Sequence, residues 1–530
     1  MKPLQGESLT AEWQEFSFEA TTYADSTIAD NFSSFSIGSA LDTAAASPVR
    51  VWLDDIRLED SNAETPSGFI RPAVEAMKEA RCGVLRFYGT SSLGSLVEEF
   101  TAENTTQAPW SFVSLASFFR FNSTDTVLDQ WMELSREVGA RPWVNVGSAN
   151  SPDDWYRLVS YLAAPAEFDD DAKRRAAHGY AAPWTETFDK IYLEIGNEWW
   201  NSIFSPYYLW DPVKHGELCK NIIAKVQEHP HLQADKIEII AGGWAVNAHH
   251  WNGVVDATSQ GQDSISIAPY LLHKLDNSKT PEDKYRTLFA DVDAYLQGPG
   301  ASTLEDLEKN AKQTSLAIYE LNTHLTGGSA GPKVASEICP SLAAGVAVLD
   351  KAMALMASMK TNPIVYFTLL QRSFQDRLGL WGVLIRTPDG ELRPRPVWQG
   401  LRLANQYLID GPMLKVEVEG SPTWDQPENG SIAETDNVPY IHAYAFRPKG
   451  DKERLNVLLI NRHLSQPFRM TVVLPFRPAP AAQRVILSGE NPADNNEERE
   501  QIQVREEKVD NFDGTVTVPA CSAVVYQLSE

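Results

Sequence analysis

The sequence predicts an α/β protein in which a (β/α)8 TIM barrel is preceded by a set of β strands and followed by an antiparallel β-sandwich. Two observations lead to this prediction. Between residues 63 and 404, seven short apolar segments alternate with amphipathic helical stretches, and repeated β-then-α units favour parallel strands joined by right-handed crossovers. In residues 1–62 and 405–530, apolar and polar residues alternate with a period of two, which is typical of antiparallel strands.

The elements follow in chain order. Residues 1–62 hold three alternating segments, EWQEFSFEA, NFSSFSIGSA and VRVWLDDIRLED. Barrel strands are predicted at 82–89, 141–148, 190–198, 236–244, 264–271, 315–322 and 362–370, with helices between them such as 123–140 and 339–360. Strands of the β-sandwich are predicted at 440–447, 454–463, 468–476, 482–489 and 514–528. The acidic run NNEEREQIQVREE is predicted to be a solvated loop and edge.

Composition excludes some classes of partner. The chain has 530 residues, enough for two or three domains, and 43% of them are hydrophobic, which allows a large core. The net charge of −25 argues against nucleic acid and against an anionic membrane, because their phosphates would be repelled. No run is expected to be long and apolar enough to span a membrane. The N-terminus MKPLQGESLTAEW lacks an apolar signal region, so the compartment stays open, and an extracellular or periplasmic location is compatible with the chain.

Cysteine and histidine spacing predicts neither a metal nor an organic cofactor. The four cysteines are far apart and form no C-x-x-C pair, so they are expected to be scattered buried thiols. His249, His250 and His324 come close to the predicted strand ends in sequence, but their spacing matches no metal-ligand pattern.

Polar residues gather where the predicted barrel strands end. Barrel enzymes build their sites from these ends. The strand-end residues are Arg86, Asn145, Asn197, Glu198, Gly242, Gly243, Trp244, Tyr270, Glu320 and Asn322. Two carboxylates stand out, Glu198 and Glu320, which come from the fourth and seventh strands if one strand precedes Arg86. They are 320 − 198 = 122 residues apart, so only the fold can bring them together.

Two carboxylates that face one cavity have the chemistry that glycosidic hydrolysis needs. One, protonated, donates to the leaving oxygen, and the other, ionised, attacks the anomeric carbon; a spacing of about 5–5.5 Å gives retention. Sharing a site also pushes the two pKa values apart, which separates the roles. The alternative is that both glutamates form ordinary ion pairs at strand ends. The occurrence of Asn-Glu on one strand and Tyr-Glu on a later one favours the catalytic interpretation.

At these residues the chain resembles the clan A glycoside hydrolases, barrel enzymes with the acid/base on strand four and the nucleophile on strand seven. EIGNE resembles the acid/base motif and IYELN the nucleophile strand. Within the clan the chain is most similar to family 51, whose best-known members are α-L-arabinofuranosidases. The similarity covers most of the chain, from GFIRPAVEAMKEARCGVLRFYGTSS to the C-terminal strands LNVLLINRH and VTVPACSAVVYQL.

The resemblance implies a role for each matching residue. Glu198 would be the acid/base and Glu320 the nucleophile. Arg86 would keep the nucleophile ionised, and Tyr270 would hydrogen-bond and orient it. Asn197 would bind the hydroxyl next to the anomeric carbon. Further candidate substrate-binding residues are Asn145, Ser91, which stands where the family has a substrate-binding Asn, and the possible sugar platforms Trp199, Trp200, Trp244 and Trp251. Core packing is the alternative for each tryptophan.

The chain departs from the family pattern in two places. The turn after Arg86 reads FYGTSS instead of Pro-Gly-Gly-Asn, and the sixth strand reads APYLLH where the family has His-Tyr-Tyr, so the sugar specificity is in question. The segments LTAEWQEFSFEATT and VRVWLDDIRLED resemble the last strands of the carbohydrate-binding-like jelly roll of some members. No clear candidate exists for the first barrel strand. Three interpretations stay open: a piece of a longer protein, a strand supplied by SFSIGSA, or a partner chain that closes the barrel.

The sequence therefore predicts a retaining glycoside hydrolase that needs no cofactor and acts on cell-wall polysaccharide or its oligosaccharides. The resemblance favours α-L-arabinofuranosidase activity. An endo-β-1,4-glucanase or xylanase is the alternative, because aromatic loops could line an open cleft. A non-catalytic carbohydrate-binding protein is the alternative of another class, although such a protein has no need of both carboxylates. The resemblance also weakly favours a homo-oligomer.

Overall fold

The computed structural model describes residue 69 and residues 71–87, 128–147, 150–201, 209–258, 261–277, 280, 282–310, 314–371, 373–374, 376–387 and 391–530. Almost all of them belong to one compact unit, residues 58–386 and 392–530. The strands expected in residues 1–62, the segment SFSIGSA and the candidate residue Ser91 lie outside the described residues. The domain limits at 62 and 404 therefore stay a prediction.

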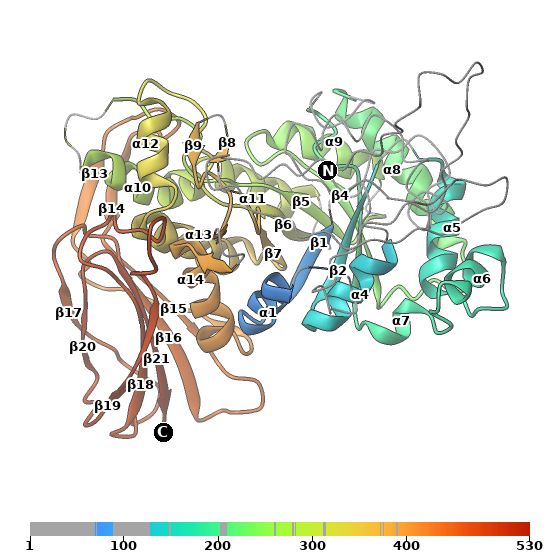
Figure 1. The fold of residues 1–530 in the computed structure, drawn as a ribbon. Coiled ribbons are helices and arrows are strands. Elements are labelled where there is room, and N and C mark those ends of the chain that lie inside the picture. The colour runs from blue at the N-terminus through green and yellow to red at the C-terminus, as the bar shows by residue number, and fades with distance from the viewer. Residues whose placement is uncertain are drawn as a thin grey trace, which may run out of the picture. The chain divides into compact units, whose positions relative to one another are not determined.

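Seven parallel strands form the central sheet, and each follows its neighbour in chain order (Figure 1). All six strand pairs are parallel. The strands are β1 (Val84–Phe87), β2 (Arg141–Val146), β3 (Ile191–Ile195), β4 (Ile237–Gly242), β5 (Ser264–Ile267), β6 (Ser315–Leu321) and β7 (Ile364–Tyr366). All seven fall within the predicted segments. The parallel, nearly closed sheet confirms the TIM-barrel fold class.

Helices connect these strands, as the β-then-α pattern requires. They are α1 (Arg71–Glu79), α4 (Leu128–Val138), α5 (Pro152–Ala163), α6 (Asp170–Ala177), α7 (Trp184–Thr187), α8 (Pro212–Gln227), α9 (Ala248–Thr258), α10 (Asp283–Gln297), α11 (Pro299–Asn310), α12 (Gly331–Ile338), α13 (Leu342–Met359) and α14 (Pro396–Leu403). Local signals set several starts. Ser151 and Asp154 form a capping box at α5, and the Asp211 carboxylate accepts from two backbone N–H groups at α8.

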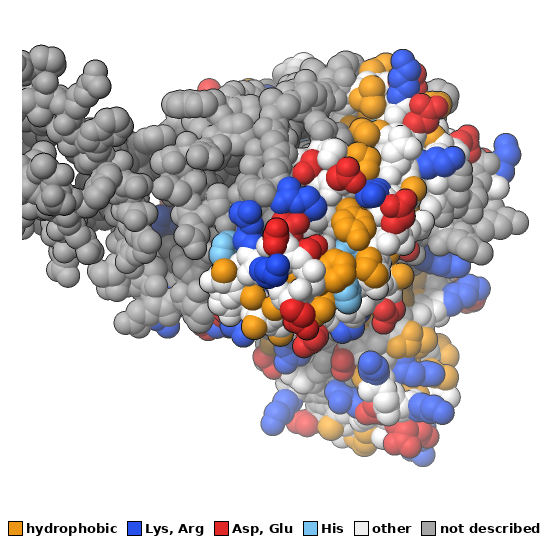
Figure 2. All heavy atoms as spheres, turned by 90° about the vertical axis from the view of Figure 1, so that its right-hand side faces the viewer, with side chains coloured by type: hydrophobic (Ala, Val, Ile, Leu, Met, Phe, Trp, Pro, Cys, Tyr) orange, Lys and Arg blue, Asp and Glu red, His pale blue; other side chains and the backbone are white. Residues whose placement is uncertain are grey.

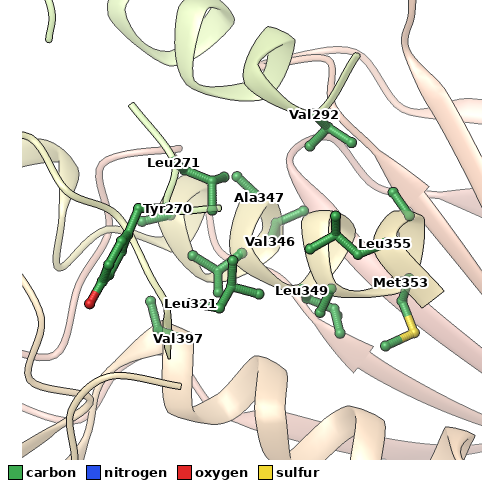
Figure 3. Packing of buried hydrophobic residues seen from close by; sticks show 14 of the residues in the cluster. Tyr270, Leu271, Val292, Leu321, Val346, Ala347, Leu349, Met353, Leu355 and Val397 are labelled. Carbon is green, nitrogen blue, oxygen red and sulfur yellow. The ribbon is translucent and has the colours of Figure 1, made fainter. Parts of the chain in front are cut away.

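Helix α13 is the central core helix. Figure 3 shows Val346, Leu349 and Leu355 on this helix packed with Leu321 of β6 and Val397 of α14. The expectation that no run could span a membrane is wrong for this helix on length and composition alone. However, 83% of its 18-residue window is buried within the fold, and a buried core helix meets the same criterion.

Antiparallel strands form the C-terminal region, as predicted. Two layers enclose a core that includes Val457, Val524 and Val518. One layer is a six-stranded sheet in the order β12 (Met413–Leu414), β15 (Ile441–Phe446), β16 (Arg454–Asn461), β21 (Ser522–Ser529), β18 (Ala482–Leu487) and β19 (Val504–Val509). The other layer pairs β17 (Phe468–Thr471) with β20 (Thr515–Val518). Shorter strand pairs are β13 (Thr423–Gln426) with β14 (Thr435–Pro439), β8 (Ser373–Phe374) with β9 (Arg377–Leu378), and β10 (Leu384–Arg386) with β11 (Leu392–Pro394).

The acidic run before the last strands is only partly a solvated loop. Its end forms β19, which is an edge strand of the six-stranded sheet, as expected. However, Glu497 forms an ion pair with the buried Arg395, with an Nε–Oε1 distance of 2.6 Å. This ion pair ties the loop to the residue before α14.

A buried polar network joins the barrel helices to the sandwich. Asp350 on α13 accepts hydrogen bonds from Tyr444 Oη at 2.7 Å and pairs with His442 Nδ1 at 2.8 Å. Arg462, at the end of β16, pairs with Asp293 on α10 at 2.6 Å. Buried charges are tolerated only when they are paired, so this network fixes how the barrel helices α10 and α13 meet the β-sandwich.

The net negative charge is not gathered into one acidic surface on the face that Figure 2 shows. This face is the one on the right in Figure 1, where α5 and α6 lie, and its acidic and basic side chains are interspersed among hydrophobic ones. The described part of this face therefore presents no uniform field to a charged partner.

Candidate active site

The candidate site lies at the carboxyl ends of the parallel strands. β1 supplies Arg86, the turn after β3 supplies Asn197 and Glu198, the segment after β5 supplies Tyr270, and β6 supplies Glu320. The parallel order of the strands places these ends at one edge of the sheet, which is why residues distant in sequence meet.

The backbone after β3 takes a conformation that few residues adopt. Gly196 has a φ of +75° and Glu198 a φ of +42°. Glycine adopts the first without a Cβ clash, whereas a non-glycine residue at positive φ stores about 1–3 kcal/mol of strain. Such strain concentrates at functional sites, and here it lies on one of the two candidate carboxylates.

Glu320 is buried and held by two donors. Its side chain accepts a hydrogen bond from Tyr270 Oη to Oε2 at 2.7 Å, and Arg86 Nη1 lies 3.2 Å from Oε1. Only 7% of Glu320 is exposed. The contacts expected of Arg86 and Tyr270 are therefore present, and both stabilise the ionised form of Glu320.

Among the described residues, the hydrogen-bond donors to Glu198 are neutral. Asn201 Nδ2 donates to Oε2 at 2.9 Å, and Tyr319 Oη donates to Oε1 at 3.3 Å. Tyr319 immediately precedes Glu320 on β6. This strand therefore carries one of the two carboxylates and donates a hydrogen bond to the other. Neither Asn201 nor Tyr319 is among the residues that the sequence singles out.

Arg86 connects the parts of the site. Its Nη2 donates to Asn197 Oδ1 at 2.7 Å, while Nη1 contacts Glu320. The guanidinium also lies over the Tyr319 ring, 4.8 Å from its centroid. Because the side-chain oxygen of Asn197 accepts from Arg86, its amide Nδ2 is left without a hydrogen-bond partner among the described residues. This donor is the one that a substrate hydroxyl could use.

Glu194 on β3 is a third carboxylate of the site, and the sequence interpretation missed it. It is 1% exposed and accepts hydrogen bonds from Arg86, Trp143, Asn145 and Ser266. The signal available in the sequence was a charged residue inside the otherwise apolar run IYLEI. A charge in a fully buried strand is costly unless it is paired, so it indicates a buried partner.

Asn145 has a different place from the one expected for a substrate-binding residue. It is 1% exposed, and its Nδ2 donates to Glu194 Oε2 at 3.0 Å and to the Gly196 carbonyl at 2.9 Å. Both contacts hold β3 and the turn after it. In this structure Asn145 Nδ2 therefore supports the protein interior, and a contact between Asn145 and substrate stays a prediction.

Burial dominates the electrostatics of the carboxylate pair. Burial raises the pKa of Glu320 to about 7; the Arg86 guanidinium and the Tyr270 hydroxyl oppose this rise, and the charge of Glu198 adds to it. Burial also raises the pKa of Glu198, against the hydrogen bonds from Asn201 and Tyr319. Two like charges repel in a buried site, so each carboxylate disfavours ionisation of the other. The direct ion pair to Arg86 favours the charge on Glu320 and the proton on Glu198.

Three of the four candidate tryptophan platforms are buried. Trp199 is fully buried, donates from Nε1 to the Gly242 carbonyl at 2.9 Å and stacks on His215. Trp251 is 1% exposed, and Trp200 is 7% exposed. The burial of the Trp199 ring favours the alternative of core packing, and a contact with substrate stays a prediction. A Cβ at Gly243 would lie 2.8 Å from Trp251 Cβ, so glycine permits this close packing at the end of β4.

Trp244 is the candidate platform whose ring is not buried. It is partly buried and follows β4, with its ring parallel to that of Trp200 at a centroid distance of 6.2 Å. Trp210, which the sequence interpretation did not name, is 50% exposed and meets the edge of Trp244 at 5.9 Å. Together the two rings form an apolar surface next to the turn that carries Glu198.

The histidine environment argues for packing. Burial lowers the pKa of His324 to about 3, and its ring lies 4.8 Å from that of Tyr270 and 5.2 Å from that of Trp381. Within the part of the chain that the structure describes, no group of three or more His, Cys, Asp or Glu residues has the arrangement of a metal site. The structure describes no position of the His249 side chain.

Comparison with known proteins identifies the fold. No family model matches the sequence, and no curated protein matches it. Among solved structures, an α-L-arabinofuranosidase from Thermotoga maritima, in complex with arabinose, aligns with a TM-score of 0.69 and 18% identity over 89% of this chain and 92% of that one. The family 51 α-L-arabinofuranosidase from Thermotoga petrophila RKU-1 aligns with a TM-score of 0.70 and 17% identity over 88% and 92%.

A more distant match belongs to another family. A Paenibacillus polymyxa xyloglucanase from glycoside hydrolase family 44 aligns with a TM-score of 0.52 and 11% identity over 86% of this chain and 94% of that one. The chain thus has the fold of family 51 arabinofuranosidases. At these identities the likeness is one of fold, and function must be argued from the site.

Proposed function

We propose that the protein is a retaining glycoside hydrolase with Glu198 as acid/base and Glu320 as nucleophile. The observation that carries the proposal is that Glu198 and Glu320, 122 residues apart in sequence (320 − 198), meet at the carboxyl ends of the parallel strands. Tyr319, the residue before Glu320, donates to Glu198, and Arg86 donates to both Glu320 and Asn197, the residue before Glu198. Desolvating two carboxylates at a strand end is costly, so a catalytic role explains an arrangement that packing alone would disfavour.

The proposed reaction has two steps. In the first, a Glu320 oxygen attacks the anomeric carbon while Glu198 gives its proton to the departing oxygen, so the glycosidic bond breaks and a glycosyl ester forms on Glu320. In the second, Glu198 takes a proton from water, and the water oxygen displaces Glu320 from the anomeric carbon. The sugar leaves with retained configuration, and both carboxyl groups return to their starting states.

The hydrogen bonds support this division of roles. Arg86 and Tyr270 both stabilise negative charge on Glu320, as a nucleophile requires. Glu198 has neutral donors from Asn201 and Tyr319, which is compatible with a group that gains and loses a proton in each cycle.

We propose arabinofuranosides as the substrate class. Several structures that share this fold are α-L-arabinofuranosidases, one of them solved with arabinose bound. Two observations favour the second candidate, an endo-acting glucanase or xylanase. The fold also matches a xyloglucanase, and the exposed Trp210 beside Trp244 offers an apolar surface to a longer chain of sugars. Non-catalytic binding is disfavoured, since binding alone requires neither the Glu198–Glu320 pair nor the donors on Glu320.

A panel of aryl glycosides tests the proposal. Wild type is assayed on the α-L-arabinofuranoside and on other sugars, with Glu320→Gln as the variant that lacks the nucleophile. We expect arabinose release by wild type and a loss of several orders of magnitude in the variant. Release from another sugar would keep the mechanism and change the substrate. Equal release by wild type and Glu320→Gln would refute the assignment of the nucleophile.

The acid/base has its own test. Glu198→Ala should lower kcat/KM by about 10²–10⁴ for substrates whose leaving group needs protonation. For leaving groups that need no proton, added azide should restore turnover, because azide replaces the water that Glu198 would activate. A variant that azide does not rescue, and that forms no glycosyl-enzyme, would contradict the retaining mechanism.

A further inference from the structure

Glu194 is the most highly connected carboxylate of the site, although neither proposed chemical step uses it. Its Oε2 accepts from Arg86 Nε at 2.8 Å, Trp143 Nε1 at 3.0 Å and Asn145 Nδ2 at 3.0 Å. Its Oε1 accepts from Ser266 Oγ at 2.6 Å. These donors come from β1, β2 and β5, so three other strands point a polar group at this one side chain.

This set of donors identifies Glu194 as an ionised group. An arginine, an indole N–H and an amide NH2 can only donate, so a proton on Glu194 Oε2 would point at a donor, and the charge of Arg86 favours the ionised form over one protonated at Oε1. Charge-assisted hydrogen bonds of this kind compensate the cost of burying the carboxylate. Glu194 therefore brings a fixed negative charge into the site.

The Arg86 guanidinium is shared between Glu194 and the candidate catalytic groups. Nε and Nη2 lie 2.8 Å and 2.7 Å from Glu194 Oε2, while Nη1 lies 3.2 Å from Glu320 and Nη2 donates to Asn197. Its shortest distances to a carboxylate are thus to Glu194, and the guanidinium plane is set by that contact. A guanidinium is a rigid fork, so fixing one side fixes the direction of the other.

Resting on the proposed function, we propose that Glu194 is a positioning residue, which holds the Arg86 guanidinium between Glu320 and Asn197 and takes up part of its positive charge. The nucleophile then faces a cation that orients it without fully neutralising it. A nucleophilic carboxylate that is bound too strongly by a cation would be less reactive, so this division of charge serves the first chemical step.

The charges around Glu194 agree with this proposal. Among the described residues that pack here, Arg86 is the cation, Glu198 and Glu320 are the other carboxylates, and Tyr319 contributes a buried hydroxyl from β6. The Glu194 charge adds to burial in raising the pKa of both Glu198 and Glu320. One cation thus faces three carboxylates, which disfavours full ionisation of the Glu198–Glu320 pair.

A titration of the two carboxyls tests the proposal without any substrate. The protein is labelled with 13C at the glutamate side-chain carboxyl carbons, and the signals of Glu198 and Glu320 are assigned by their loss in the Glu198→Gln and Glu320→Gln variants. Glu194→Gln removes a negative charge, so the positive charge of Arg86 is no longer partly neutralised by Glu194 and stabilises the ionised forms of Glu198 and Glu320 more strongly. We therefore expect the apparent pKa of the pair to fall by about one unit. An unchanged titration in Glu194→Gln would overturn the proposal, whether or not the wild type turns over any glycoside.

Glu238 offers a matched control. It lies on the neighbouring strand β4, accepts from the hydroxyl of Ser264 and pairs with Lys190 at 3.5 Å, much as Glu194 accepts from Ser266 and pairs with Arg86. However, it pairs in register with Tyr192, two residues before Glu194, toward the amino-terminal end of the strands. Glu238→Gln removes the same charge from the same type of setting, and it should leave the titration of the pair unchanged.

Kinetics give the second readout once the active substrate is known. For Glu194→Gln we expect kcat/KM to fall about 10- to 100-fold through misplacement of Arg86, and its pH profile to move to lower pH by about one unit. A fall in activity with an unmoved profile would indicate a merely structural role and contradict the proposal. If Glu194→Gln does not fold, Glu194→Asp is the second variant, because the shorter side chain keeps the charge but moves it away from Arg86. Glu194→Asp should lower kcat without moving the pH profile. An unchanged kcat would overturn the proposal.

Discussion

Removing the Tyr270 hydroxyl is the sharpest single perturbation of the candidate nucleophile. Tyr270→Phe deletes one oxygen, which donates to Glu320 Oε2 at 2.7 Å, and leaves an 8% exposed ring in place. A hydrogen bond to a charged group contributes about 1.5–3 kcal/mol. Since one pKa unit corresponds to about 1.36 kcal/mol, losing this bond from the ionised form should raise the pKa of Glu320 by about one to two units.

The assay is the pH dependence of kcat/KM on the best aryl glycoside. Glu320 must be ionised to attack, so the acid limb of the profile should move up by about one to two pH units in Tyr270→Phe. At a pH on the acid limb, kcat/KM should fall about 10- to 100-fold, because the ionised fraction falls by that factor. Thermal stability should change little, since the aromatic packing is retained.

Tyr444→Phe is the matched control for this experiment. The Tyr444 hydroxyl also donates to a buried carboxylate at 2.7 Å, that of Asp350 in the network between barrel and sandwich. Its loss should lower the melting temperature and leave the pH profile where it is. The reasoning about Glu320 is refuted if Tyr270→Phe leaves the acid limb unmoved, or if Tyr444→Phe moves it as far.

Two further predictions concern the platforms and the network. Trp244→Ala should raise KM for oligosaccharides more than for aryl monosaccharides in steady-state kinetics. Trp199→Ala should mainly lower the free energy of unfolding, by about 3–5 kcal/mol in denaturant, because the Trp199 ring is fully buried. The reverse outcome would exchange the roles of the two tryptophans. The charge of Asp350, with other neighbours, raises the pKa of His442 although burial lowers it, so protonated His442 stabilises the fold below about pH 6.5, its unfolded value, and this contribution disappears as pH rises through the higher folded value. Burial raises the pKa of Asp293, but Arg462 and His442 outweigh this effect and lower the pKa to about 2. The ionised Asp293 carboxylate therefore stabilises the fold above about pH 4, and this stabilisation is lost as the pH falls toward 2. Calorimetry of wild type and His442→Asn should therefore show the largest difference in melting temperature between about pH 4 and 6.5, and a difference independent of pH would contradict this account.

The strand pattern and the strand-end residues could be predicted because each depends on local signals. Period and length distinguish buried parallel strands from helices, and a TIM barrel places its strand ends at one face. That is why the sequence could predict that Arg86, Asn197, Glu198, Tyr270 and Glu320 lie at one end of the sheet.

What the sequence could not provide was the direction and burial of individual side chains. Trp199 directly follows Glu198, and Asn145 lies near the carboxyl end of β2, yet the Trp199 ring packs against His215 and the Asn145 amide donates to Glu194. Glu194 was missed because a glutamate four residues before Glu198 looks like part of the strand. Its significance depends on donors from β1, β2 and β5, which are non-local contacts.

The helix α13 shows the same limit for composition. Its 18 residues are apolar enough for a membrane span, and only the surrounding elements show that the apolar surface is covered by protein. Likewise, the buried pairs of Asp350 and Arg462 have no signature in a single sequence, because both partners are separated by many residues.

The central claim, that Glu198 and Glu320 form a retaining pair, is tested most directly by trapping the intermediate. Glu198→Ala is incubated with an aryl glycoside that has a good leaving group, and the intact protein and its peptides are examined by mass spectrometry. The account predicts one added glycosyl residue per chain, carried by the peptide that contains Glu320 and released by azide. An adduct on another residue, or turnover of the substrate with no adduct on Glu320, would contradict it.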